Sequence, residues 1–239
     1  MQAFFEDPPP VKELASPEIL YKWLFLDLNS YFASVEQQDN PRLRGSPIAV
    51  VPMMTDGTCA IAASKEAKRY GIKTGTKIYD AKRMCPDLIC VLARHDIYVE
   101  YHHRILDEVI KHTPINKVWS VDELSSRLPP NKQTREAAVG VATRLKAGLR
   151  ENLGECITCS IGLAPNGYLG KVASDMQKPD GLVLLDADTM AEKLFRLELR
   201  GLCGINVGIE TRLHNAGIKT VEQLWHLNPK HARKIWGGV

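Results

Sequence analysis

Two apolar stretches that end in acidic residues decide the fold prediction: Trp23-Leu24-Phe25-Leu26, followed by Asp27, and Val118-Trp119-Ser120-Val121, followed by Asp122 and Glu123. Short apolar runs of this kind are typical of buried strands. If both strands belong to one sheet, that sheet brings three carboxylates to one place. Neighbouring residues of a regular strand face opposite ways, so Asp122 and Glu123 can share a site only if the chain bends or turns there.

Three carboxylates at one place favour a divalent-metal site. Like charges close together raise one another's pKa and destabilise the fold unless a cation neutralises them. Oxygen ligands select a hard ion, Mg²⁺ or Mn²⁺, over zinc. Two ions roughly 3.5–4 Å apart would serve phosphoryl or nucleotidyl transfer. The alternative is that each acid is a solvated residue at the end of a strand.

The remaining pattern predicts an α/β fold. Apolar residues at a spacing of four predict a helix over 96–112 that ends at Thr113-Pro114. A strand is expected over 115–122, followed by a short segment that runs back through Leu128. Further along we expect a second long helix marked by Val141, Leu145 and Leu149, a strand over 156–163, a helix over 168–177 and a strand over 182–185. Helices covering one face of the strands would leave the other face open for substrate.

Charge is distributed unevenly along the 239 residues. Residues 33–94 carry ten Lys and Arg against six Asp and Glu, and residues 212–239 carry five against one. Basic flanks favour contact with phosphates, although a solvated basic face has the same composition. Neither a secretory signal nor a membrane span is visible, so we expect a cytoplasmic protein with no membrane partner and six reduced cysteines. The pair Cys156 and Cys159 is weak support for a metal or redox site.

Three motifs give the chain a family resemblance. Phe25-Leu-Asp-Leu-Asn-Ser-Tyr-Phe-Ala-Ser-Val-Glu-Gln37 resembles the opening motif of the Y-family lesion-bypass DNA polymerases of the DinB/UmuC type, and Ser120-Val-Asp-Glu123 resembles their second catalytic motif. Gly162-Leu-Ala-Pro-Asn-Gly-Tyr-Leu-Gly-Lys-Val-Ala-Ser-Asp-Met-Gln-Lys-Pro-Asp-Gly181 is similar to a third family block. The order and approximate spacing also resemble the family, from about Tyr21 to the C-terminus.

The resemblance implies a division into parts. A palm would comprise residues 21–32 and 95–183, interrupted by fingers at 33–94, and a helical thumb would follow at 184–239. Residues 1–20 would be an N-terminal extension. Relatives continue into a little finger domain that holds the template and primer, so we expect this chain to represent a catalytic core without that domain.

The resemblance also implies the active-site roles. Asp27, Asp122 and Glu123, with the backbone carbonyl of Leu28, would hold two Mg²⁺ ions, with Mn²⁺ as a possible substitute. Phe32 would be the steric gate that occupies the space of a ribose 2′-hydroxyl, and Tyr31 would pack nearby as part of the substrate site. The alternative for both aromatic residues is a place in the core.

Lysines are the expected contacts of the triphosphate. Ser64 can cap a short helix that places Lys65 and Lys68 on one face, and Lys171 matches a family lysine near the terminal phosphates. The family commonly has Thr, Tyr and Arg where this chain has Ala62, Lys65 and Lys68, and an ammonium group cannot reproduce the bidentate guanidinium contact. Two further departures are Gly167, where many relatives have a basic residue, and Asn29, where an Asp is frequent; for Asn29 we expect modest consequences.

The segment Leu202-Cys-Gly-Ile-Asn-Val-Gly208, followed by Leu213-His-Asn-Ala-Gly-Ile218, resembles a helix-hairpin-helix element. Gly204, Asn206 and Gly208 would then present backbone amides to a DNA phosphate. Asn206 replaces a common Gly, and Asn tolerates positive φ better than most residues, which would preserve the turn. A plain packed helical turn is the alternative.

The resulting prediction is a template-directed DNA polymerase that adds dNMP to a primer 3′-hydroxyl. Its partners would be primer-template DNA and dNTP, and possible further partners are a sliding clamp or repair proteins. Two alternatives remain open: a catalytically weak, DNA-binding accessory protein with the polymerase fold, and a palm-type nucleotidyl cyclase or other two-metal phosphotransferase.

Overall fold

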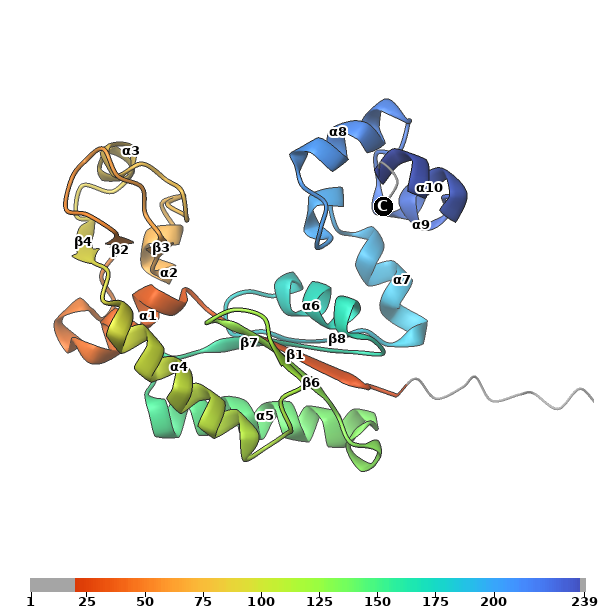
Figure 1. Ribbon diagram of the computed structural model, residues 1–239, viewed down its shortest axis with the longest axis horizontal. Helices are drawn as coiled ribbons and strands as arrows, with labels where there is room; N and C mark the ends of the chain where they lie inside the picture. The colour runs from red at the N-terminus through yellow and green to blue at the C-terminus, as the bar shows by residue number, and fades with distance from the viewer. Residues whose placement is uncertain (1–19, 237–239) are drawn as a thin grey trace, which may run out of the picture.

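The protein, seen here as a computed structural model that describes residues 20–236, contains two β-sheets, with helices packed around them and a helical C-terminal part (Figure 1). The larger sheet has five strands in the order β5-β6-β1-β7-β8, and the smaller has three in the order β3-β2-β4. The expected mixture of helices and strands is therefore confirmed. Of the predicted N-terminal extension, residues 1–19 lie outside the described part of the chain.

Strand β1 (Trp23–Leu28) lies at the centre of the larger sheet. It pairs antiparallel with β6 (Glu123–Arg127) on one side and with β7 (Cys159–Ala164) on the other. β5 (Lys117–Val118) extends the β6 side, and β8 (Leu182–Leu184) runs parallel to β7. Because side chains alternate along a strand, Leu24 and Leu26 face one side of this sheet and Asp27 faces the other.

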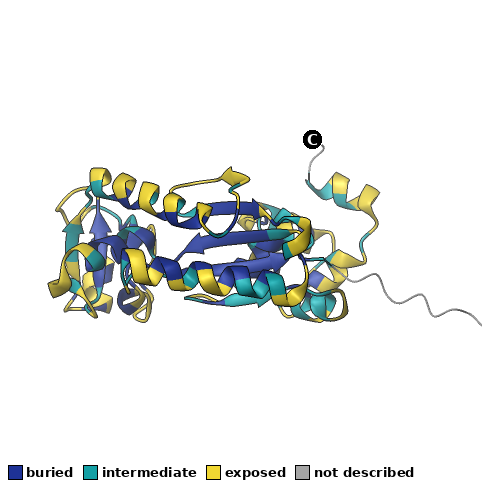
Figure 2. Ribbon diagram, turned by 90° about the horizontal axis from the view of Figure 1, so that it is seen from below, coloured by how far each residue is buried: buried dark blue, intermediate teal, exposed yellow. Residues whose placement is uncertain are grey.

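Helices α4 (His95–Ile110) and α5 (Arg135–Leu153) cover the leucine face of the sheet (Figure 1). The residues at a spacing of four that predicted them are mostly buried: Tyr101, Ile105 and Val109 on α4, and Val141, Leu145 and Leu149 on α5. In Figure 2 the strands of this sheet are buried while the outer sides of the helices are exposed. The apolar stripes of two amphipathic helices thus form the main core with the sheet.

Helix α6 (Gly167–Met176) packs on the opposite face of the same sheet, which corrects the expectation that this face is left open. Glycines permit the close approach: a Cβ atom on Gly162 would lie 2.0 Å from the carbonyl oxygen of Gly170. The helix therefore rests directly on β7 and β1, and it brings its own polar side chains over Asp27.

The smaller sheet forms a second unit with its own core. It comprises β2 (Ile48–Val51), β3 (Ala62–Ala63) and β4 (Ile89–Leu92), with helices α2 (Lys65–Lys68) and α3 (Ile78–Met84). Helix α1 (Tyr31–Asp39) and the 3-10 turn η1 (Pro41–Leu43) connect this unit to β1. The buried cluster consists of Ala49, Val51, Ala60, Ala63, Ala67, Ile72, Ile78, Ala81, Cys85 and Leu88.

The C-terminal part of the chain is helical. It contains α7 (Ala187–Phe195), the 3-10 turn η3 (Leu199–Gly201), α8 (Val207–Asn215), α9 (Val221–Trp225) and α10 (Pro229–Trp236). Its core includes Val172 and Ala173, so α6 joins these helices to the larger sheet. In Figure 1 the helices of this part and the three-stranded unit rise on the α6 side of the larger sheet, at opposite ends.

Two predicted strands have different bounds. The strand expected over 115–122 is interrupted: β5 ends at Val118, residues 119–122 form a bend, and Glu123 begins β6, after which the 3-10 turn η2 (Pro130–Lys132) follows. Trp119 is 54% exposed, so the buried strand expected there is wrong. The strand expected from Cys156 begins at Cys159, because residues 154–158 form the turn after α5.

The six cysteines, all within the described residues, are free. Cys159 is buried in the main core, and this burial raises its pKa to about 12. Within residues 20–236 no helix is both long and apolar enough to cross a membrane.

Candidate active site

Asp27 lies near the end of β1, where its side chain is only 7% exposed. The backbone beyond it is held by Asn29, whose amide donates to Ser160 Oγ at 3.0 Å and whose oxygen accepts from the backbone of Asp180 at 2.8 Å. Ser30 then adopts a left-handed conformation (φ 50°) and begins α1. Asn29 is thus buried in contacts between β1 and β7, which gives it a structural role that the sequence analysis missed.

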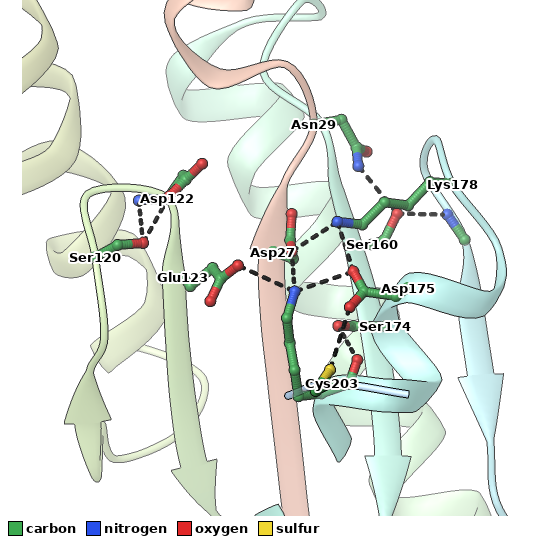
Figure 3. Close-up of polar contacts among 12 residues, drawn as sticks. Asp27, Asn29, Ser120, Asp122, Glu123, Ser160, Ser174, Asp175, Lys178 and Cys203 are labelled. Atoms are coloured by element: carbon green, nitrogen blue, oxygen red, sulfur yellow. Dashed lines mark hydrogen bonds and ion pairs between the residues drawn. The ribbon is translucent and has the colours of Figure 1, made fainter. Parts of the chain in front are cut away.

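The acidic pair lies where the bend after β5 meets β6: Asp122 is the last residue of the bend and Glu123 the first of β6, so the chain turns there as the sequence required. The backbone N–H of Leu28 donates to the carbonyl oxygen of Asp122 at 2.8 Å, which ties this bend to β1. Glu123 pairs with Asp27 in register across the two strands. The carboxylate of Asp122 instead accepts from Ser120 Oγ at 2.6 Å, and Figure 3 shows it apart from the other two carboxylates.

Two lysines bind the carboxylates. The ammonium group of Lys171 lies 2.6 Å from Asp27 Oδ2, 3.0 Å from Glu123 Oε1 and 3.0 Å from Asp175 Oδ1. The ammonium group of Lys178 lies 2.7 Å from both Asp27 Oδ2 and Asp175 Oδ1 (Figure 3). Asp27 therefore shares one oxygen between two cations.

The pKa values follow from burial and these contacts. Burial disfavours charged lysines, but the hydrogen bonds to Asp27 and Asp175 outweigh it and raise the pKa of both Lys171 and Lys178. For Asp175, burial is outweighed by the two lysines, and its pKa is lowered. Burial, together with the charges of Asp27 and Asp122, raises the pKa of Glu123 despite its contact with Lys171. A cation added near Glu123 would therefore favour the charged form of this carboxylate.

A cavity of about 580 Å³ opens beside these carboxylates. Its walls are formed by the end of β1, the start of α1 and the bend before β6. Residues of β3 and α2, and residues in and just after α6, complete them. The lining residues are Asp27, Leu28, Asn29, Ser30, Tyr31, Phe32, Ile61, Ala62, Ala63, Lys65, Lys68, Arg69, Thr74, Asp122, Glu123, Lys171, Lys178 and Pro179. Nine residues that the sequence assigned to the catalytic and nucleotide site therefore line this one cavity. They are Asp27, Leu28, Tyr31, Phe32, Lys65, Lys68, Asp122, Glu123 and Lys171.

The two aromatic residues at the start of α1 have different environments. The Tyr31 hydroxyl donates to the carbonyl oxygen of Tyr98 at 2.6 Å, and burial raises its pKa. Phe32 is half-buried and stacks on the ring of Tyr98, with centroids 4.4 Å apart. Tyr31 is thus mainly a core residue that borders the cavity, whereas Phe32 presents part of its ring to it.

Lys65 and Lys68 reach the cavity from α2, as the predicted cap allows. The Ser64 hydroxyl accepts from the backbone N–H of Ala67 at 3.2 Å and begins the helix. Burial and repulsion by Lys178 lower the pKa of Lys68, against the attraction of Asp27 and Asp122. Cations on α2 therefore face carboxylates on the larger sheet across the cavity.

The donor set fits a hard divalent cation. All candidate ligands are oxygens, and the Lys171 ammonium group already bridges Asp27 and Glu123 as a cation. Among the described residues, no three acidic, His or Cys side chains converge in a metal-binding arrangement. Asp122 would have to turn away from Ser120 to complete one.

The turn near residue 204, where a helix-hairpin-helix element was expected, lies outside this cavity. Gly204 has φ 90°, whereas Asn206 has φ −89° and caps α8 by accepting from the backbone N–H of Ile209 at 3.0 Å. The expectation of a positive φ at Asn206 is therefore wrong, because its side chain serves as the N-cap. Gly204, Asn206 and Gly208 are all exposed, and their contact with DNA stays a prediction.

Asp175 and Lys178 are site residues that sequence analysis missed. Lys178 lies beyond Met176, where α6 ends. Asp175 follows Lys171 by four positions, a spacing that places both residues on one side of the helix. That periodicity was the available signal.

Comparison with known proteins places the chain in a family. Residues 26–175 match the IMS family, described as impB/mucB/samB. The chain belongs to this family. It is 40% identical over 203 residues to the DNA polymerase IV of Moorella thermoacetica, covering 84% of this chain and 50% of the relative. It is 35% identical over 218 residues to that of Bacteroides fragilis, covering 91% and 59%.

Solved structures of family members agree with the fold. DinB from Sulfolobus solfataricus superposes with a TM-score of 0.79 at 29% identity, over 90% of this chain and 63% of that one. An insertion ternary complex of Dbh DNA polymerase gives a TM-score of 0.80 at 30% identity, over 90% and 63%. The Y-family resemblance is thus confirmed, and the chain spans about half the length of the curated relatives it matches.

Proposed function

We propose that this chain is the catalytic part of a lesion-bypass DNA polymerase, which adds dNMP to a primer 3′-hydroxyl under the direction of a template. The observation that supports this best is the cavity between the larger sheet and α2, with carboxylates on one wall and Lys65 and Lys68 on the other. A triphosphate with bound divalent cations fits this arrangement, because the cations would face the carboxylates and the negative phosphate oxygens would face the lysines. On this proposal the five-stranded unit is the palm, the three-stranded unit the fingers and the C-terminal helices the thumb.

We assign Asp27, Asp122, Glu123 and the carbonyl of Leu28 to two Mg²⁺ ions, with Mn²⁺ as a substitute. Such ions, when bound, lower the pKa of the primer hydroxyl and neutralise charge on the triphosphate. The chain supplies the oxygen ligands and the bend that presents two adjacent acids. The raised pKa of Glu123 supports this assignment, because a nearby cation would favour its charged form.

The lysines are assigned to the triphosphate. Lys65 and Lys68 lie on one helix at the cavity wall, and Lys171 and Lys178 lie next to the carboxylates. Ammonium groups act as point charges rather than as bidentate donors. We therefore expect them to supply affinity for dNTP with less geometric control than arginines would give.

Phe32 is assigned to sugar selection. Its ring is held by the stack on Tyr98 and borders the cavity. A rigid ring in that position would occupy the space that a 2′-hydroxyl needs. Tyr31, whose hydroxyl is bound inside the core, would support Phe32 rather than touch the nucleotide.

For DNA, we propose that the exposed turn at Gly204, Asn206 and Gly208 contacts a backbone phosphate. A sliding clamp or a repair protein as a further partner, and a cytoplasmic location, belong to the same proposal, since they follow from the polymerase function alone.

Primer extension tests the function. The full 239-residue chain is incubated with primer-template DNA, dNTP and Mg²⁺, beside an Asp122→Ala, Glu123→Ala double variant. The matched control is Asp107→Ala, which removes an exposed acid from α4 on the other face of the sheet. Template-dependent extension that the double variant loses and the control retains is expected.

The other outcomes distinguish the alternatives. DNA binding without extension would favour the accessory DNA-binding protein. Conversion of free nucleoside triphosphate in the absence of DNA would favour a cyclase or another two-metal phosphotransferase. Either result contradicts the polymerase proposal.

A further inference from the structure

The bend between β5 and β6 presents an exposed tryptophan beside the carboxylates. Trp119 is 54% exposed, yet its indole N–H donates to the Oγ of the buried Ser125 at 3.0 Å. Its backbone N–H donates to the carbonyl oxygen of Glu123 at 2.9 Å. The ring is therefore fixed in place while much of it faces solvent, which is the arrangement of a binding surface rather than of a core residue.

The strand register places this ring on the active-site face of the sheet. Glu123 pairs with Asp27, and Ser125 pairs with both Phe25 and Lys117. Paired residues of antiparallel strands share a face, so Ser125 and Lys117 lie on the side that carries Asp27. The bond from Trp119 to Ser125 Oγ puts the indole on that side as well.

A cation accompanies the ring. The ammonium group of Lys117 lies 3.6 Å from the centroid of the Trp119 ring, and the Lys117 side chain is exposed. Arg127, two residues beyond Ser125 on β6, is also exposed. An aromatic face next to positive charges suits a sugar or base that is followed by phosphates.

The cavity and Trp119 lie on different sides of the carboxylates. It extends past the end of β1 toward α1 and α2, whereas Lys117 lies level with Phe25, two residues back along β1 from Asp27. In-line nucleotidyl transfer needs the attacking and leaving oxygens on opposite sides of the reacting phosphorus. If the triphosphate fills the cavity, the primer end must approach from the side of Trp119.

We infer that Trp119 and Lys117 form a binding site for the 3′-terminal part of the primer strand, with the indole against the terminal sugar or base and the ammonium group on a primer phosphate. This inference rests on the proposed polymerase function for its geometry. It concerns DNA affinity, however, so it is tested without dNTP, metal ions or turnover.

The experiment is a binding titration of the full chain with primer-template DNA in EDTA across a salt series. Trp119→Ala should weaken binding about tenfold, because loss of an aromatic contact to a nucleotide has an effect of this order. Trp119→Phe should retain most of the affinity. Lys117→Gln should reduce the slope of log K against log salt by roughly 0.7–0.9, the effect of one phosphate contact. The matched control is Lys22→Gln, an exposed lysine just before β1.

A second readout locates the contact on the primer. With 2-aminopurine as the primer's terminal base, the wild-type chain should change the probe's fluorescence, and Trp119→Ala should lose most of that change. A probe placed in the template overhang should respond equally in both proteins. Melting temperatures verify that each variant is folded. If Trp119→Ala does not fold, the DNA affinity and salt slope of Lys117→Gln test the inference instead.

Unchanged affinity and salt slope in Trp119→Ala and Lys117→Gln would overturn the inference. If DNA affinity is unchanged in Trp119→Ala and a separate primer-extension assay gives a raised KM for dNTP, Trp119 belongs to the nucleotide site and the inference is overturned too. A chain that binds DNA through Trp119 but extends no primer would contradict the polymerase proposal alone.

Discussion

The ammonium nitrogen of Lys171 lies between two carboxylates of the candidate metal site, 2.6 Å from Asp27 Oδ2 and 3.0 Å from Glu123 Oε1. Without a metal ion, buried acids at such a site need another cation. Lys171, helped by Lys178, provides it, and α6 is packed closely enough on β1 to make this possible.

Competition between Lys171 and a divalent cation follows from this contact. Lys171→Gln should melt at a lower temperature than the wild type in EDTA, because Asp27 and Glu123 lose a shared cation. It should gain more stability from Mg²⁺ or Mn²⁺, since a ligand stabilises the state that binds it more tightly. Thermal melts across a metal titration measure this, with Lys22→Gln as the control. An equal metal-induced shift in both variants would mean that the ions bind elsewhere.

Asp27 and Asp122 should differ in their effects on stability. Asp27→Asn weakens the contacts of two lysines with this buried side chain, at a cost of about 1–3 kcal/mol. Asp122→Asn disturbs only the contact with Ser120, so its effect should stay within about 0.5 kcal/mol. Both should lose nucleotide incorporation.

Denaturant titration and primer extension measure these two properties separately. Repulsion among the carboxylates alone would make removal of either aspartate harmless to stability, but the two lysines that contact Asp27 predict a loss at that residue. An equally stable Asp27→Asn variant would show that those ion pairs contribute nothing.

Phe32→Ala should relax sugar selection. Removal of the ring opens space beside the cavity and should raise the ratio of kcat/KM for ribonucleotides over deoxynucleotides on the order of 100-fold. Tyr31→Phe is the control, because it removes only the hydroxyl that donates to Tyr98. Steady-state incorporation of matched dNTP and rNTP provides the ratios. A constant ratio would place Phe32 in the core and not at the sugar.

The dNTP affinity should depend on pH through Lys68. Its lowered pKa means that it loses its charge at a lower pH than an ordinary lysine, so KM for dNTP should begin to rise earlier on the alkaline side. Lys68→Arg should remove that early rise, because guanidinium stays protonated. KM profiles against pH test this, with DNA affinity followed in parallel. A parallel loss of DNA affinity would assign Lys68 to the duplex.

Acid stability should depend on Asp175. A carboxyl group whose pKa is lowered by folding contributes stability above its unfolded pKa and loses it as the pH falls through the folded value. Asp175→Asn should therefore be less stable at neutral pH by about 1–2 kcal/mol, and its stability should fall less steeply below about pH 4. Urea titrations at several pH values measure both. Identical acid profiles would mean that the lysines do not hold this carboxylate.

The sequence by itself determined the central strand β1, the two long helices α4 and α5, and which residues gather at the candidate site. The continuous apolar run at the start of Trp23–Leu28 and the spacing of four on α4 and α5 are local patterns, and the burial of these apolar residues follows directly from them. The need for a turn at Asp122 and Glu123 also followed from local geometry, since adjacent strand residues cannot share a face. Motif similarity then supplied the roles proposed for Asp27, Phe32 and the lysines, because those residues stand at matching positions.

Only the tertiary structure decided which groups meet. Lys171 and Lys178 contact Asp27 across 144 and 151 residues of chain, and no local pattern specifies a contact at that separation. The contact depends on Gly162 and Gly170 letting α6 rest on the sheet. Likewise, Trp119 belongs to an apolar run that predicts a buried strand, but β5 ends at Val118 and lies at the sheet edge, so the ring is left exposed beside the carboxylates. Burial at an edge depends on what packs there, and that is a property of the whole fold.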